Sequence, residues 1–180
     1  MKAPSRQGEF VLPAATLTIL RRALRKEAGA LKATHALHAA GYAAGEGVAE
    51  DFAAFAGATR PETLADADFW SLLNDFFVRR GWGGIRHERV HPGMAILTSS
   101  NWVEADDEGR ETQPGCAFSS GVLASLFSRL AGGPVAVLEV ACRSRGDEAC
   151  RFLFGAEEAV HEVYGHLLEG ASLETALAQT

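Results

Sequence analysis

Three cysteines and one glutamate are the residues of this chain whose types and spacing best suit chemistry. Cys142 and Cys150 bracket a seven-residue segment between two apolar runs, and Gly146 with Asp147 supplies turn residues midway between them. We therefore expect a β-hairpin that holds the two thiols close together across the strand pair. Thiols placed in this way either oxidise to a disulfide or share a metal ion.

The nearby residues favour a metal. Glu139 lies three residues before Cys142, and Cys116 opens an apolar run with helical period, so its thiolate can interact with a helix N-terminus. Three thiolates and one carboxylate complete a tetrahedral shell for zinc and leave no position for water. The residues thus predict a structural zinc site made of Cys116, Glu139, Cys142 and Cys150.

This prediction carries one geometric requirement and leaves two alternatives. Glu139 and Cys142 have opposite parity on a strand, so both can face one ion only if the strand bulges or ends between them. Three arginines close in sequence are expected to offset the negative shell, namely Arg143, Arg145 and Arg151. The alternatives are a Cys142–Cys150 disulfide with Cys116 as a core thiol, or three unrelated buried cysteines. With no secretory leader and an odd number of cysteines, we expect a cytoplasmic protein.

Composition predicts one compact domain. A chain of 180 residues can bury a sizeable core without disulfides, and a net charge of −6 with a pI near 5.5 disfavours nucleic acid as a partner. No apolar run approaches the span of a bilayer, so we expect no membrane insertion. Basic residues cluster near the N-terminus, but Glu27 interrupts them, which predicts the solvated face of a helix. These basic residues are Arg21, Arg22, Arg25, Lys26 and Lys32.

The hydrophobic periodicity predicts an α+β fold, with helices packed on an antiparallel sheet. We expect an N-terminal tail over 1–13, a single folded domain over 14–170 and a C-terminal tail over 171–180. The helices are predicted over 14–28, 31–55, 67–80, 116–130 and 156–169, and the strands over 85–90, 93–99, 101–105, 135–141 and 151–154. In the second helix, Gly41 and Gly45 would let another backbone or a ligand approach closely.

Three segments resemble the 4-vinyl reductase domain, also called the predicted hydrocarbon-binding domain. Residues 133–152, Gly-Pro-Val-Ala-Val-Leu-Glu-Val-Ala-Cys-Arg-Ser-Arg-Gly-Asp-Glu-Ala-Cys-Arg-Phe, resemble its Glu-x-x-Cys strand, Gly-Asp turn, and Cys followed by an aromatic. Residues 115–121 resemble its Cys-x-x-x-x-Gly helix start, and residues 38–45 its Gly-x-x-x-Gly helix. The resemblance covers about residues 30–156, with the segments in the expected order.

The resemblance implies a fold similar to that of Golgi-tethering subunits and haem nitric-oxide sensors, which are commonly dimeric. In relatives that sense aromatic compounds, the residues matching Cys116, Glu139, Cys142 and Cys150 hold a structural zinc. Phenol sensors of the family place a histidine near the position of Trp70, so the resemblance implies that this chain lacks that partner for a phenol hydroxyl.

The resulting prediction is a zinc-stabilised sensor or carrier domain for a hydrophobic or aromatic small molecule. Binding is expected to shift a homodimer interface or the interface with a downstream protein. The expected pocket residues are Phe69, Trp70, Leu73, Phe77, Trp102 and Phe118.

Two other functions remain as alternatives. The family resemblance also suggests an accessory protein or a reductase acting on the vinyl group of a bacteriochlorophyll-type tetrapyrrole precursor. Reduction needs a hydride source, and the chain shows neither a nicotinamide nor a flavin fingerprint. A haem gas sensor is disfavoured because the Tyr-x-Ser-x-Arg motif of that related family is absent from the sequence. The histidines and serines form no catalytic constellation, so we expect binding rather than catalysis.

Overall fold

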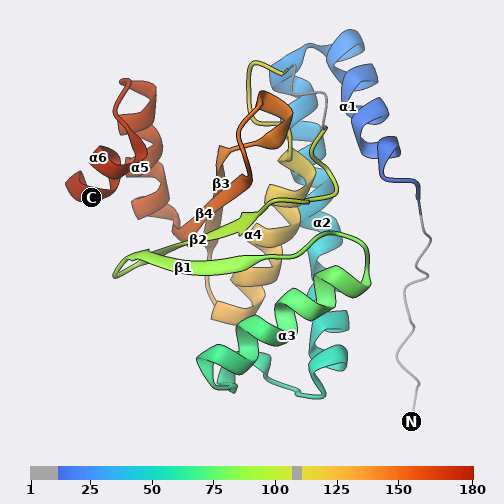
Figure 1. Cartoon of the computed structure of the whole chain (residues 1–180), viewed down its shortest axis with the longest axis vertical. Helices are drawn as coiled ribbons and strands as arrows, with labels where there is room; N and C mark the ends of the chain where they lie inside the picture. Colours follow the sequence, from blue (N-terminus) through green and yellow to red (C-terminus); the bar gives the residue numbers. More distant parts are fainter. Residues whose placement is uncertain (1–11, 107–110) are drawn as a thin grey trace.

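The computed structural model describes residues 12–106 and 111–180, and it has the predicted α+β fold (Figure 1). Most of the predicted N-terminal tail lies outside the described residues. None of the helices in the described part of the chain has both the length and the apolar composition that a membrane-spanning helix needs. The elements are α1 (Ala15–Ala28), α2 (Ala30–Ala56), η1 (Pro61–Thr63), α3 (Asp66–Arg79), β1 (Arg86–His91), β2 (Met94–Ser99), α4 (Ala117–Ala131), β3 (Val135–Ala141), η2 (Arg143–Arg145), β4 (Cys150–Ala156), α5 (Glu157–Leu168) and α6 (Leu173–Gln179).

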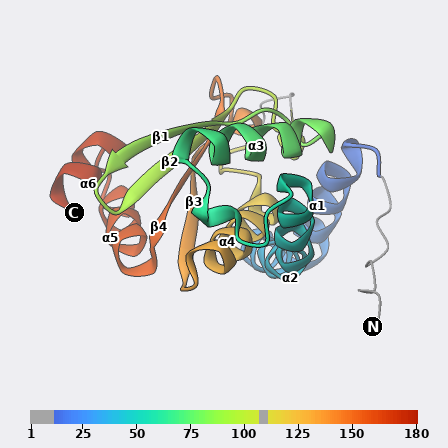
Figure 2. The same cartoon turned by 90° about the horizontal axis from the view of Figure 1, so that it is seen from below.

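One antiparallel sheet, in the order β1-β2-β4-β3, divides the apolar residues between two clusters. Leu97 pairs with Phe152, and both belong to the larger cluster with α2, α3 and α4. Ile96 pairs with Leu153, and both belong to a smaller cluster with α5 and α6. Because successive strand residues point to opposite faces, the two clusters lie on opposite sides of the sheet. Figures 1 and 2 show α5 and α6 apart from the other helices.

Helices α2 and α4 cross with their backbones in close contact. A Cβ atom added to Gly41 would lie 1.9 Å from the carbonyl oxygen of Phe118, and one added to Gly121 would lie 2.1 Å from that of His38. Gly45 faces Ser125 in the same way, at 2.5 Å. The expected close approach at Gly41 and Gly45 is therefore made by the backbone and side chains of α4, which positions the start of α4 and hence Cys116.

Two predicted elements were wrong. Residues 101–105 form a turn instead of a strand: the N–H of Ala105 donates to the carbonyl of Trp102 at 3.2 Å, and the N–H of Val103 donates to the carbonyl of Trp82 at 2.8 Å. Residues 173–179, expected within a tail, form α6. Its first turn is capped by Ser172, whose hydroxyl accepts from the N–H of Thr175. Its buried Ala176 belongs to the smaller apolar cluster.

Candidate metal centre and ligand cleft

A bulge in β3 brings Glu139 and Cys142 to the same side. Glu139 pairs with Phe152 and Ala141 pairs with Arg151, so the strand register shifts between Glu139 and Ala141. Strand β3 ends at Ala141, and Cys142 follows in an extended conformation. The geometric requirement for a shared site is therefore met by the local backbone.

The four predicted ligand residues meet in one buried cluster. One potential ligand atom each from Cys116, Glu139, Cys142 and Cys150 lies within 4.8 Å of all the others. The Cys116 sulfur is 3.8 Å from that of Cys142 and 3.9 Å from that of Cys150, and all three cysteines are free thiols. Two sulfurs bound tetrahedrally to one zinc, each at about 2.3 Å, lie about 3.8 Å apart. The cluster has the spacing of a metal-ligand set rather than that of a disulfide, in which the sulfurs lie about 2.05 Å apart.

Backbone donors hold these ligand atoms in place. The N–H of Cys116 donates to Glu139 Oε2 at 2.8 Å, and the N–H of Gly115 donates to the Cys142 sulfur at 3.3 Å. The second carboxylate oxygen, Glu139 Oε1, is buried without a hydrogen-bond partner. A buried carboxylate oxygen left in this state is costly unless a cation accepts it. The donor set and the orphaned oxygen therefore fit a bound metal ion.

The pKa shifts within the cluster also fit a bound metal ion. Burial, and next the charge on Cys142, raise the pKa of the Glu139 carboxyl well above its ordinary value. Hydrogen bonds with the thiols of Cys116 and Cys150 lower the pKa of the Cys142 thiol. Without a metal, protons compensate the negative charge of the cluster. A metal would take the place of these protons, because its ligands bind in their deprotonated forms.

A cation that the sequence did not point to, Arg21, packs beside this centre in addition to the three arginines that lie near it in sequence. Arg145 pairs with Asp147 at 2.8 Å, and Asp147 accepts from the backbone N–H of Cys142. Arg21 of α1, predicted to lie on a solvated helix face, is only 4% exposed and donates to the carbonyl of Gly115 at 2.7 Å. The prediction for Arg21 was wrong because residues 104–106 and 111–115, far along the chain, pack against α1.

A cleft of about 510 Å³ opens between α3, β1, β2, α4 and β4. Four aromatic side chains line it: Phe69, Trp70, Phe127 and Phe154. The Trp70 ring stacks on His87 with centroids 3.8 Å apart, and Phe127 stacks on Phe154 at 4.5 Å. Burial lowers the pKa of His87, so its imidazole is neutral at neutral pH. The cleft thus combines apolar rings with the neutral imidazole of His87 and with other polar groups, among them Arg89, His91 and the carboxylate of Asp66, which accepts from the Trp70 indole at 3.1 Å.

Of the six predicted pocket residues, the structure brings Phe69 and Trp70 into the cleft. Three others lie in the larger apolar core, namely Leu73, Phe77 and Trp102, and Phe118 packs beside Trp82. Phe127, Phe154 and His87 were not foreseen as cleft residues. Phe152 and Phe154 have the same parity on β4, and this parity, the available signal, does not tell which part of that face meets a cavity.

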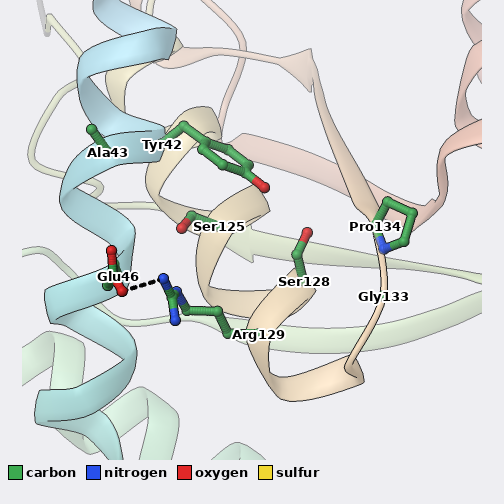
Figure 3. A pocket seen from close by; sticks show the side chains of 8 residues that line it. All are labelled: Tyr42, Ala43, Glu46, Ser125, Ser128, Arg129, Gly133 and Pro134. Carbon is green, nitrogen blue, oxygen red and sulfur yellow. Dashed lines mark ion pairs between the residues drawn. The ribbon is translucent and has the colours of Figure 1, made fainter.

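A second hollow, of about 400 Å³, lies between α2 and the end of α4 (Figure 3). Its charged groups satisfy each other, because Arg129 pairs with Glu46 across the helices. The hydroxyl of Ser128 accepts from the N–H of Val135 at 2.9 Å. The charged groups of this hollow are therefore already paired with each other.

Residues 97–156 match the family model of the 4-vinyl reductase domain, which confirms the predicted resemblance over that stretch. The "Uncharacterized protein MJ0745" of Methanocaldococcus jannaschii is 31% identical over 83 residues, which are 46% of this chain and 44% of that protein. This chain thus aligns with less than half the length of that relative.

Two solved structures share the fold. The phenol-responsive sensory domain of the transcription activator PoxR, with phenol, superposes with a TM-score of 0.68 at 20% identity, over 83% of this chain and 77% of that one. A vinyl-4-reductase family protein from Methanocaldococcus jannaschii superposes with a TM-score of 0.51 at 16% identity, over 83% of both chains. At these identities the likeness shows the fold.

Proposed function

We propose that this domain binds a hydrophobic or aromatic small molecule in the cleft beside Trp70, as a sensor or a carrier. The observation that carries the proposal is the aromatic lining of a cleft whose volume, about 510 Å³, lies in the range of small-molecule sites. The shared fold with the PoxR sensory domain, whose structure contains phenol, supports the same class of ligand. A sensor would pass its ligand state to a second copy of the chain or to a downstream protein.

We also propose that Cys116, Glu139, Cys142 and Cys150 hold a structural zinc ion. The sulfur spacing and the orphaned Glu139 oxygen support this assignment. Four protein ligands would close the coordination shell, so zinc there would supply cross-linking rather than an activated water. The four ligands come from the start of α4, the end of β3 and the start of β4, so one ion would join three segments of the chain.

The ligand-binding proposal is tested with the Trp70→Ala substitution. The change enlarges the cleft, so the affinity for an apolar probe such as naphthalene, measured by calorimetric titration, should change by more than the fold stability does. Tyr164→Ala on α5 is the matched control, because Tyr164 is 43% exposed and does not line the cleft. Absence of binding by the wild type to naphthalene and to phenol, with Trp70→Ala only losing stability, would contradict the proposal.

The zinc proposal is tested by elemental analysis after purification in reducing buffer. We expect one zinc per chain in the wild type and none in a Cys142→Ser/Cys150→Ser double variant. His161→Ala is the control for adventitious surface binding, because His161 is an exposed imidazole outside the cluster. Zinc retained by the double variant, or absent from the wild type, would show that the assignment is wrong.

A further inference from the structure

Arg21 is a buried cation from α1 with one short hydrogen bond. Its side chain is 4% exposed, and Nη1 donates to the Gly115 carbonyl at 2.7 Å and, more weakly, to the Glu104 carbonyl at 3.5 Å. Its Nε and Nη2 have no hydrogen-bond partner, and the nearest carboxylates lie 3.7 Å and 4.0 Å from Nη2, on Glu111 and Asp106. The Gly115 carbonyl is therefore the atom that the guanidinium holds most firmly.

The carbonyl of Gly115 and the N–H of Cys116 belong to the same peptide group. That N–H donates to Glu139 Oε2 at 2.8 Å. Arg21, the peptide group and Glu139 therefore form one continuous hydrogen-bond chain. Hydrogen bonds in series polarise each other, and a cationic donor at one end makes the peptide N–H a stronger donor at the other. The chain fixes one oxygen of Glu139 and leaves the other, Oε1, free to accept a metal.

We infer that Arg21 is a positioning residue of the metal centre, which acts through the Gly115–Cys116 peptide group to orient and stabilise the Glu139 carboxylate. The inference rests on the proposed metal site and adds a role for α1, which contributes no ligand. Residues that orient metal ligands in this way commonly contribute to metal affinity. Because coupling is reciprocal, metal binding should in turn hold α1 in place.

The packing around Gly115 supports a direct contact. A Cβ atom at this position would lie 2.5 Å from Arg21 Nη1 and 3.0 Å from the Ser144 hydroxyl. The guanidinium thus lies against bare backbone, in space that any other residue would occupy. Arg22, the next residue of α1, is 51% exposed and pairs with Asp106, so it offers a control of equal charge on the same helix.

The experiment compares zinc affinity in wild type, Arg21→Gln and Arg22→Gln, by competition with a chromogenic chelator. We expect Arg21→Gln to bind zinc about 10–100-fold more weakly, the usual effect of removing a group that orients a metal ligand, while Arg22→Gln binds as the wild type does. The second readout is the visible spectrum after Co²⁺ substitution. Its d–d bands should shift in Arg21→Gln because the carboxylate is no longer oriented, whereas a merely structural loss of packing would leave the bands unchanged.

The outcomes separate this inference from the proposal on which it rests. A wild type without metal would overturn both. A wild type that binds zinc, with Arg21→Gln matching Arg22→Gln in affinity and spectrum, would overturn the role of Arg21 alone. If Arg21→Gln does not fold, Gly115→Ala disturbs the same contact from the loop side. Weaker zinc binding by Gly115→Ala supports the inference, and wild-type affinity overturns it.

Discussion

The close crossing of α2 and α4 predicts that replacing Gly41 by alanine lowers the stability of the fold, whereas the same change at Gly165, which lies away from the crossing, raises it. Gly41 is buried in α2, where an added Cβ would lie 1.9 Å from the Phe118 carbonyl oxygen and 2.8 Å from its carbonyl carbon. Ordinary contact begins near 3.4 Å, so the Gly41→Ala substitution forces the two helices apart locally by roughly 1.5 Å. Backbone atoms cannot rotate away as a flexible side chain can, so the crossing itself must yield.

The magnitude follows from two opposing terms. Alanine is better than glycine inside a helix by about 1 kcal/mol, which favours the variant. Overpacking a tight contact costs about 1–3 kcal/mol, and the rigid partner here places the cost at about 3 kcal/mol. The net destabilisation is therefore about 2 kcal/mol. For a domain of this size, that lowers the melting temperature by about 4–8 °C.

The assay is urea denaturation and thermal melting of the metal-loaded protein, with Gly165→Ala as the matched control. Gly165 lies inside α5, and an added Cβ would meet nothing within 4 Å. This control should therefore be stabilised by about 1 kcal/mol. A denaturation midpoint for Gly41→Ala equal to or above that of the wild type would refute the reasoning about the crossing. An unchanged midpoint for Gly165→Ala would refute the term for helix propensity.

Three further expectations concern the metal centre and the core. Stripping the metal should speed amide hydrogen exchange throughout 135–156, because the ion would join both strands of that hairpin; unchanged protection would contradict its structural role. Zinc affinity should fall as the pH falls from about 8 to about 6, because the metal must displace protons from the thiols and from Glu139, and burial raises the pKa of Glu139. Chelator competition at both pH values measures this effect, and equal affinities would contradict it. Ser119→Ala should lower the free energy of unfolding by about 1–3 kcal/mol, because the buried Trp102 indole N–H, which lies 2.8 Å from the Ser119 hydroxyl, loses that partner. Denaturation measures this, with the exposed Ser71→Ala as control. A loss no larger than that of Ser71→Ala would show that the bond contributes little.

The candidate metal centre is the part that the sequence determined most fully. A hairpin signal placed Cys142 and Cys150 opposite each other, and a helix start placed Cys116 at an apolar run, because these are local patterns of turn residues and periodicity. The α+β class and most helix boundaries follow from the same local signals. In the folded chain, the four predicted ligand residues meet.

Only the tertiary structure decided which aromatic residues line the cleft and that Arg21 lies against the metal centre. Phe152 and Phe154 share the same parity on β4, yet one lies in the core and the other lines the cleft. Arg21 stands 94 residues before Gly115, and its burial depends on that distant segment packing against α1. A sequence pattern reports the side of a helix or strand on which a residue lies, but the burial of that side is a property of packing between distant segments. For this reason the ligand residues were predictable from spacing, whereas the cleft and the positioning role of α1 emerged only from the folded chain.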